Sequence, residues 1–113
     1  MSRFISYLNS AEEILLEYNA SIPFALYIKN YFSKHKKYGS GDRKAIASLC
    51  YSYFRAGNLL NKNLNQENLL LAAFLCADRP TKIIDELKPE LGEHLLLSTE
   101  EKLQLIHLTQ NIL

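Results

Sequence analysis

Three residues at helical spacing give this chain its clearest chemical signal. Because an α-helix turns by about 100° per residue, Lys44, Tyr51 and Arg55 fall in one narrow stripe, together with Ser48. Lysine and arginine neutralise phosphates, and an exposed tyrosine offers a ring on which an unpaired base stacks. The stripe therefore suits contact with RNA, although an ordinary solvated helix face carries the same residue types.

A second group of cations, Lys34, Lys36 and Lys37, comes just before this stripe. One interpretation is simple helix termination, because cations favour the negative end of a helix dipole and Gly39 is a good stop. The other is contact with an RNA backbone, in which Lys36 and Lys37 neutralise phosphates and Tyr38 supplies a second stacking ring. A turn at Gly39 would place this run beside the start of the next helix, on one surface.

Asp42 and Arg43 open the same helix. Ser40 and Asp42 both have side chains able to cap its first turn. Arg43 projects beside Ala47 and Cys50, at the edge of the expected buried face. It is either a structural arginine that binds carbonyls or a carboxylate of a neighbouring helix, or a phosphate contact.

Charge is distributed unevenly along the chain. The net charge is only +1 overall. Between residues 29 and 62 there are eight basic residues and a single acidic one, Asp42, a net charge of +7, whereas the rest of the chain carries −6. The segment is therefore a basic island in an acidic chain, which favours a local contact with a polyanion over attraction by the whole molecule.

A family resemblance rests on this stretch. Asp42-Arg43, Leu49-Cys50-Tyr51 and Arg55 together resemble a signature of the N-terminal, NusB-like helical domain of the Sun/Fmu RNA cytosine-C5 methyltransferases. The similarity covers residues 22–62 well and the remainder only as a helical pattern. The family's usual glycine after the tyrosine is Ser52 here, which puts any close helix crossing at that point in doubt.

The resemblance implies a fold and a role. The fold would be an all-α, single-domain, NusB-like bundle of five to six helices over residues 1–113. The role would be to bind and position ribosomal or transfer RNA for an S-adenosylmethionine-dependent enzyme, whose catalytic domain would lie downstream in a longer protein. We predict that Asp42 and Arg43 form a structural motif and that RNA is bound by Lys36, Lys37, Lys44, Tyr51 and Arg55.

We assign no catalytic, cofactor or metal-binding residue within this chain. Cys50 and Cys76 sit among apolar residues without an adjacent cation, and neither has the Pro-Cys context of the family's nucleophile, so both are interpreted as free thiols of a reducing compartment. The three histidines lack metal-ligand spacing. Gly39-Ser40-Gly41 follows a basic helix end, whereas an S-adenosylmethionine site uses a glycine-rich turn after a strand. That cofactor is therefore implied for the parent enzyme only.

The elements that carry these residues are all expected to be helices, because no window alternates as a strand does. A first helix, or two if Ser10 and Glu13 form a capping box, spans residues 4–18, and a second begins at Pro23. The third, at residues 40–55, is followed by a fourth that is apolar nearly all round and that Asn65 can cap. A short helix comes next, and Pro89 and Gly92 mark its end and a loop. Ser98 and Glu101 are a second capping-box candidate and open a last helix.

Location and alternatives follow from the same pattern. The chain has no signal peptide, and its longest apolar run, residues 69–77, is less than half a membrane span, which predicts a cytoplasmic protein without membrane contact. Two other functions stay open: a stand-alone NusB-like RNA-binding factor of the antitermination type, and a helical protein-interaction module. The latter would show an apolar docking face, with Leu105, Leu108 and Ile112 as candidates.

Overall fold

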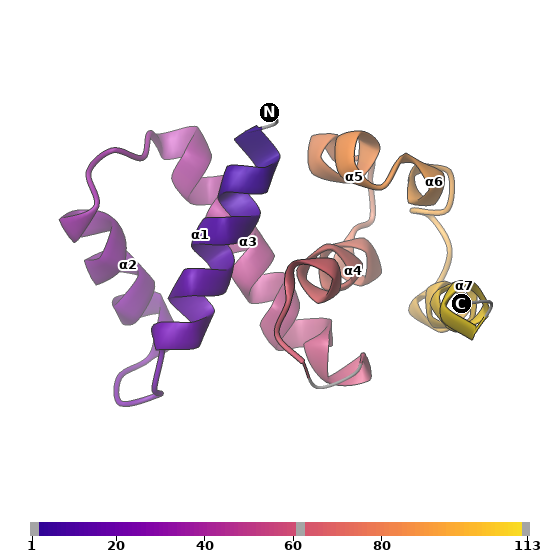
Figure 1. Ribbon diagram of the computed structural model, residues 1–113, viewed down its shortest axis with the longest axis horizontal. Coiled ribbons are helices and arrows are strands. Elements are labelled where there is room, and N and C mark those ends of the chain that lie inside the picture. Colours follow the sequence, from indigo (N-terminus) through magenta and orange to yellow (C-terminus); the bar gives the residue numbers. More distant parts are fainter. Residues whose placement is uncertain (1–2, 61–62, 112–113) are drawn as a thin grey trace.

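The computed structural model describes the backbone of residues 3–60 and 63–111, and the side chains as far as His107. Within these residues the chain forms helices and no strand, and no helix is long and apolar enough to cross a bilayer. The elements are α1 (Arg3–Glu17), α2 (Phe24–Lys34), α3 (Ser40–Ala56), a 3-10 turn η1 (Gly57–Leu59), α4 (Gln66–Cys76), α5 (Lys82–Leu87), α6 (Pro89–Gly92) and α7 (Thr99–Asn111) (Figure 1). The all-α, single-domain fold is thus confirmed.

The first half of the molecule is built on α1 crossing α3, with α2 on the outer side of this pair (Figure 1). Its core is rich in aromatic rings, and Tyr7, Tyr31, Phe32 and Tyr38 are all buried there beside aliphatic residues. A second set of rings, the aromatic cluster, lies where α2 begins and α3 ends. Its neighbouring ring centroids are 4.7–6.2 Å apart, and it consists of Tyr18, Phe24, Tyr27, Tyr51 and Phe54.

The second half is organised around α4 and has an almost wholly aliphatic core. Leu69, Ala72 and Phe74 of α4 are completely buried, so the apolar run occupies the centre of the molecule as expected. The helices α5, α6 and α7 contribute Ile84, Leu91 and Ile106 to this core. Among its described buried residues, Phe74 is the only aromatic one. The two halves therefore share α4 but are packed from different residue types.

Two of the expected caps are confirmed. The Asn65 side chain accepts a hydrogen bond from the Asn68 amide at 2.8 Å. Ser98 and Glu101 form a reciprocal capping box, with both bonds at 3.1 Å. At the start of α3 the capping is done by Asp42, whose carboxylate accepts the Gly39 amide at 3.1 Å, while Ser40 is the first helical residue.

Two local expectations are wrong. α1 is one continuous helix, and Ser10 does not cap, because its hydroxyl is buried and lies 2.8 Å from the Tyr38 hydroxyl. Pro89 and Gly92 do not mark a loop but bound the short helix α6. Pro89 occupies the first helical turn, where the amide hydrogen that proline lacks would have no partner anyway.

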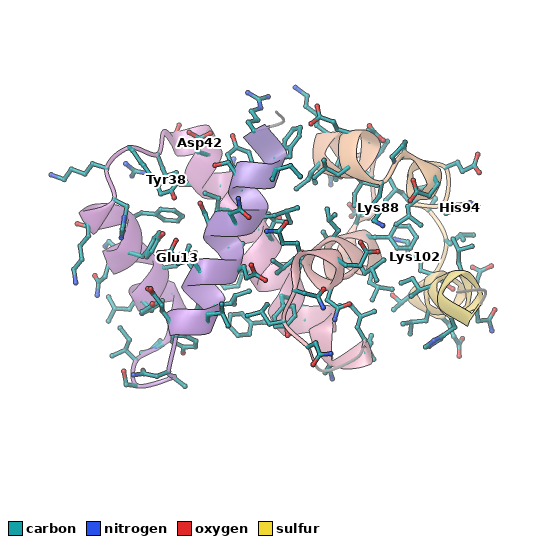
Figure 2. All side chains as sticks on the ribbon, viewed as in Figure 1. Glu13, Tyr38, Asp42, Lys88, His94 and Lys102 are labelled. Carbon is teal, nitrogen blue, oxygen red and sulfur yellow. The ribbon has the colours of Figure 1, made fainter. Side chains whose placement is uncertain are left out.

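Lys102 joins the last helix to the central one (Figure 2). It is only 2% exposed, and its ammonium group donates to the Phe74 carbonyl at 2.9 Å and to the Ala77 carbonyl at 2.7 Å. It also lies 5.0 Å from the centre of the Phe74 ring. A cation thus sits on the last carbonyls of α4, where the helix dipole favours positive charge, although burial lowers the pKa of Lys102.

Candidate nucleic-acid interface

Five cations gather where α2 ends and α3 begins, and we call this group the basic corner. All five side chains are exposed, and they come from α2, from the connecting loop and from the first two turns of α3: Lys29, Lys36, Lys37, Arg43 and Lys44. Between them lies a surface hollow of about 520 Å³ whose lining includes Lys29, Lys36 and Arg43. Its other lining residues, Phe32 and Ser33, carry no charge, so the hollow is a positive concavity.

Carboxylates do not neutralise this corner. Among the described residues, no ion pair involves Lys29, Lys36 or Lys44. The one acidic residue of the basic island, Asp42, accepts hydrogen bonds from the Tyr7 hydroxyl and from the Gly39 amide. These two bonds, the Tyr7 bond above all, hold the pKa of Asp42 below its ordinary value. Asp42 therefore fastens α1 to the start of α3.

The loop under the corner is held by Arg43 and Tyr38. Arg43 donates from Nε to the Tyr38 carbonyl at 3.0 Å, which is the type of bond expected of a structural arginine. The Tyr38 ring packs 5.6 Å from Phe32, and its hydroxyl pairs with Ser10. Tyr38 is 9% exposed, so the prediction that its ring stacks on a base is wrong.

The predicted RNA-binding residues fall into two places. Lys36 lines the hollow of the basic corner, Lys37 follows it in the loop, and Lys44 follows Arg43 on α3. Arg55 follows Lys44 by eleven residues, which is about 16 Å along α3, and it lines a separate cavity. Tyr51 is half-buried and belongs to the aromatic cluster, with its ring perpendicular to that of Phe24 at 5.5 Å. Lys44, Tyr51 and Arg55 therefore lie along α3 as the sequence predicts, but they do not form one compact site.

Sequence reasoning missed Lys29. It precedes the loop by two helical turns, yet Lys29, Ser33 and Lys36 follow one another at intervals of four and three residues. The first interval places Lys29 and Ser33 on one face of α2, and the loop that follows brings Lys36 to the same hollow. The four-residue spacing of Lys29 and Ser33 was the available signal. Lys62, the last cation of the basic island, lies outside the described residues.

The part of the chain that the structure describes gathers no metal site, and it buries the Cys50 thiol. No group of three histidine, cysteine or acidic side chains is placed to hold a metal ion there. Burial raises the pKa of the Cys50 thiol to about 12, and its sulfur lies 3.9 Å from the Ala11 carbonyl oxygen. At neutral pH Cys50 is therefore protonated and a poor nucleophile.

Comparison with known proteins names no family. No protein-family model, curated protein or solved structure matches this chain. The resemblance to NusB-like domains therefore stays a hypothesis, and the case for a function rests first on the basic corner.

Proposed function

We propose that this domain binds the backbone of structured RNA through its basic corner and positions that RNA for a cytosine-C5 methyltransferase. The observation that carries the proposal is the cluster of exposed cations at the α2–α3 corner, which no carboxylate pairs with among the described residues. Cations that are neither buried nor paired keep their full charge for a polyanion. Contacts of this kind act on phosphates and do not read base sequence.

The geometry of the hollow supports phosphate as the group bound. Lys29 and Lys36 approach it from α2 and the loop, and Arg43 approaches it from α3. Of the Arg43 guanidinium, only Nε is engaged with the described residues, so its terminal nitrogens can still donate to a phosphate oxygen. The structural and the phosphate-binding interpretations of Arg43 are therefore compatible.

The methyltransferase part of the proposal rests on the resemblance of Asp42-Arg43, Leu49-Cys50-Tyr51 and Arg55 to the Sun/Fmu signature. On this hypothesis S-adenosylmethionine and the nucleophilic cysteine belong to a catalytic domain elsewhere in the same protein. A stand-alone NusB-like factor would use the basic corner in the same way but would have no catalytic domain. The length of the native gene product separates these two RNA-binding proposals.

One observation favours the protein-interaction alternative. Leu16, Leu26 and Phe54 are 68%, 47% and 48% exposed, and Phe54 belongs to the aromatic cluster. The docking face suggested by the sequence is at the other end of the chain. There Leu105 is half-buried, and the side chains of Leu108 and Ile112 lie outside the described residues.

The decisive experiment compares salt dependence. RNA stem-loop binding is measured by fluorescence anisotropy over a range of salt for the parent chain and for the triple variant Lys36→Ala, Lys37→Ala, Lys44→Ala. Each lost phosphate contact lowers the slope of log K against log salt by about 0.7–0.9, so the triple variant is expected to lose about 2–3 units of slope.

The control for this measurement is Lys88→Ala, which removes a positive charge from the opposite half of the molecule. Lys88 pairs with Glu67 at 2.8 Å and is not part of the basic corner. We expect its slope to equal that of the parent chain. Equal slopes for the parent and the triple variant would refute the basic corner as the RNA site.

A further inference from the structure

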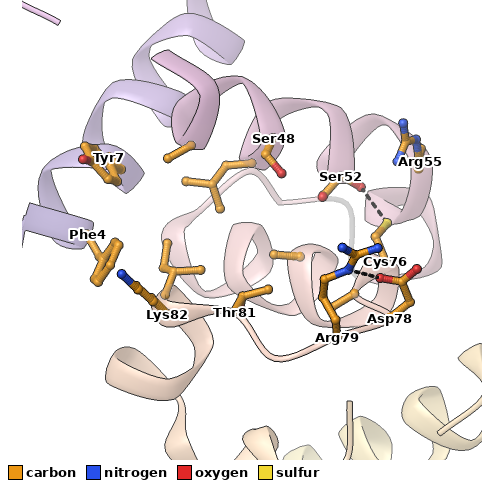
Figure 3. Close-up of a pocket in the computed structure, with 15 residues that line it drawn as sticks. Phe4, Tyr7, Ser48, Ser52, Arg55, Cys76, Asp78, Arg79, Thr81 and Lys82 are labelled. Carbon is orange, nitrogen blue, oxygen red and sulfur yellow. Dashed lines mark hydrogen bonds and ion pairs between the residues drawn. The ribbon is translucent and has the colours of Figure 1, made fainter. Parts of the chain in front are cut away.

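A second cavity, of about 440 Å³, lies between α3, the end of α4 and the start of α5 (Figure 3). We call it the α3–α5 cavity. Its apolar walls include Leu49 of α3, Ala73 and Ala77 at the end of α4, and Ile83 of α5. The α3 wall also carries the side chains of Ser48 and Ser52. Its volume lies within the range of about 300–1,000 Å³ that is usual for small-molecule sites.

The two ends of this cavity differ in chemistry. Figure 3 shows Phe4, Tyr7 and Lys82 at one end and Arg55, Arg79 and Asp78 at the other. The Phe4 and Tyr7 rings pack edge to face, with centroids 5.7 Å apart. Tyr7 is only 8% exposed, so the first end presents the half-buried Phe4 ring beside the Lys82 ammonium group, and the other end presents two guanidinium groups and one carboxylate.

Among the described residues, Asp78 is the only carboxylate that lines the cavity, and it engages one of these two arginines. Arg79 Nε lies 3.2 Å from Asp78 Oδ1, but both side chains are at least 80% exposed. An exposed ion pair of this kind contributes little to stability. An anion with more oxygen atoms can therefore compete with Asp78 for Arg79. Arg55 has no ion pair with any described residue.

We propose that the α3–α5 cavity binds a nucleotide, with its base against the apolar walls and the Phe4 ring and its phosphate at Arg55 and Arg79. An inorganic anion would leave the apolar walls unused, and a neutral aromatic molecule would leave the arginines unused. Guanidinium groups match phosphate in shape and charge, and flat rings pack well on aromatic side chains. The inference goes beyond the proposed function, because none of these residues belongs to the basic corner.

A free nucleotide and an unpaired nucleotide of an RNA strand present the same chemistry to the cavity. Nuclear magnetic resonance titration of the 113-residue chain with adenosine monophosphate tests the site directly. We expect saturable shifts at the amides of Ser48 and Ser52. Adenosine and inorganic phosphate, added separately, are expected to bind at least about tenfold more weakly, because each lacks half of the contacts.

Two substitutions predict opposite changes. Arg55→Ala is expected to weaken binding of adenosine monophosphate by about tenfold or more, because it removes a charged hydrogen-bond donor. Asp78→Asn is expected to tighten binding by a few-fold, because it frees Arg79 and removes a repelling charge. Affinity that is unchanged in both variants would overturn the proposal.

A chemical measurement on the unsubstituted chain gives a second test. Cys76 lines the cavity and is half-buried, and its sulfur lies 3.8 Å from the Ser52 carbonyl oxygen. Saturating adenosine monophosphate is expected to slow alkylation of Cys76 by iodoacetamide several-fold. An unchanged alkylation rate would contradict occupancy of the cavity. Because the measurement uses the unsubstituted chain, it does not depend on the folding of a variant.

The test also separates the two sources of the ligand and the two proposals. If oligoadenylate shifts the same amides and binds with higher affinity than the mononucleotide, the natural ligand is an RNA strand. If the mononucleotide binds with the higher affinity, the ligand is a free nucleotide. Lys37→Ala is the control, since it is expected to weaken RNA binding without changing the affinity for adenosine monophosphate. If the nucleotide binds but substitutions at the basic corner do not change RNA binding, only the proposed function fails.

Discussion

Lysine has opposite roles in the two halves of this molecule. In the second half Lys102 is buried on the last carbonyls of α4, and Lys88 is paired with Glu67. At the basic corner of the first half, Lys36 and Lys44 are exposed and form no ion pair with a described residue.

The difference shows which charges the fold itself needs. Lys102 satisfies two carbonyls of the same chain, so its removal is expected to damage the structure, whereas the partly exposed pair of Lys88 and Glu67 contributes little. The lysines of the corner contribute little to packing, so their removal is expected to leave the structure intact and to change binding only. Three predictions follow, from the largest effect to the smallest. The first tests this division directly, and the other two test polar contacts that hold the first half together.

The largest effect is expected from Lys102→Met. It leaves the Ala77 carbonyl without its donor and removes a charged hydrogen bond from Phe74, at a cost of about 2–3 kcal/mol in the free energy of unfolding. Urea unfolding followed by far-ultraviolet circular dichroism measures this cost. The matched variant Lys44→Met, on the exposed stripe, should stay within about 0.5 kcal/mol of the parent chain. An equal loss of unfolding free energy in the two variants would contradict the distinction between the structural Lys102 and the exposed lysines of the basic corner.

A smaller effect is expected from Tyr38→Phe. The change removes the buried hydroxyl that pairs with Ser10, which destabilises the first half by about 1–2 kcal/mol. Tyr51→Phe provides the matched control, because its hydroxyl has no hydrogen-bond partner among the described residues and a loss below about 0.5 kcal/mol is expected. If Tyr51→Phe proves the more damaging change, then Tyr51 and not Tyr38 anchors the structure, and its assignment to an RNA surface falls.

The smallest effect is expected from Asp42→Asn and depends on pH. Hydrogen bonds from Tyr7 and Gly39 lower the pKa of Asp42 from its ordinary value of 3.8. Its contribution to stability is therefore fully present above that value and is lost as the pH falls through the lowered pKa of the folded protein. Thermal unfolding between neutral and acidic pH should show a shallower acid decline for Asp42→Asn than for the parent chain. The stability of Glu100→Gln, an exposed control, should fall with decreasing pH as that of the parent chain does. If Asp42→Asn also shows the decline of the parent chain, the hydrogen bonds of Asp42 do not contribute to stability.

Local chemistry explains what could be predicted from the sequence. The cap at Asn65 and the box formed by Ser98 and Glu101 use residues three positions apart, so the sequence contains all that they need. The central place of α4 follows from the fact that its residues are apolar on all sides. Lys36, Lys37 and Lys44 are close along the chain, on either side of the turn at Gly39, so the sequence alone indicates that the loop and the start of α3 are basic.

What could not be predicted depends on distant partners. Ser10 and Glu13 have the spacing of a capping box, but the Ser10 hydroxyl finds Tyr38 across 28 residues. Lys102 follows two glutamates and has the pattern of a solvated face, yet the end of α4 supplies two carbonyls for it. Arg55 was grouped with the cations of the corner, whereas the course of the chain after α4 places it with Arg79 and Asp78.

The unequal division of aromatic residues determines what optical methods can detect. All seven tyrosines lie between Tyr7 and Tyr53, and the chain has no tryptophan. Intrinsic fluorescence and near-ultraviolet dichroism therefore report almost solely on α1, α2 and α3, while far-ultraviolet dichroism reports on every helix. Detachment of α7 alone would leave fluorescence and near-ultraviolet dichroism unchanged but would reduce the far-ultraviolet dichroism. Unfolding curves that do not coincide would thus reveal two cooperative units in this single domain.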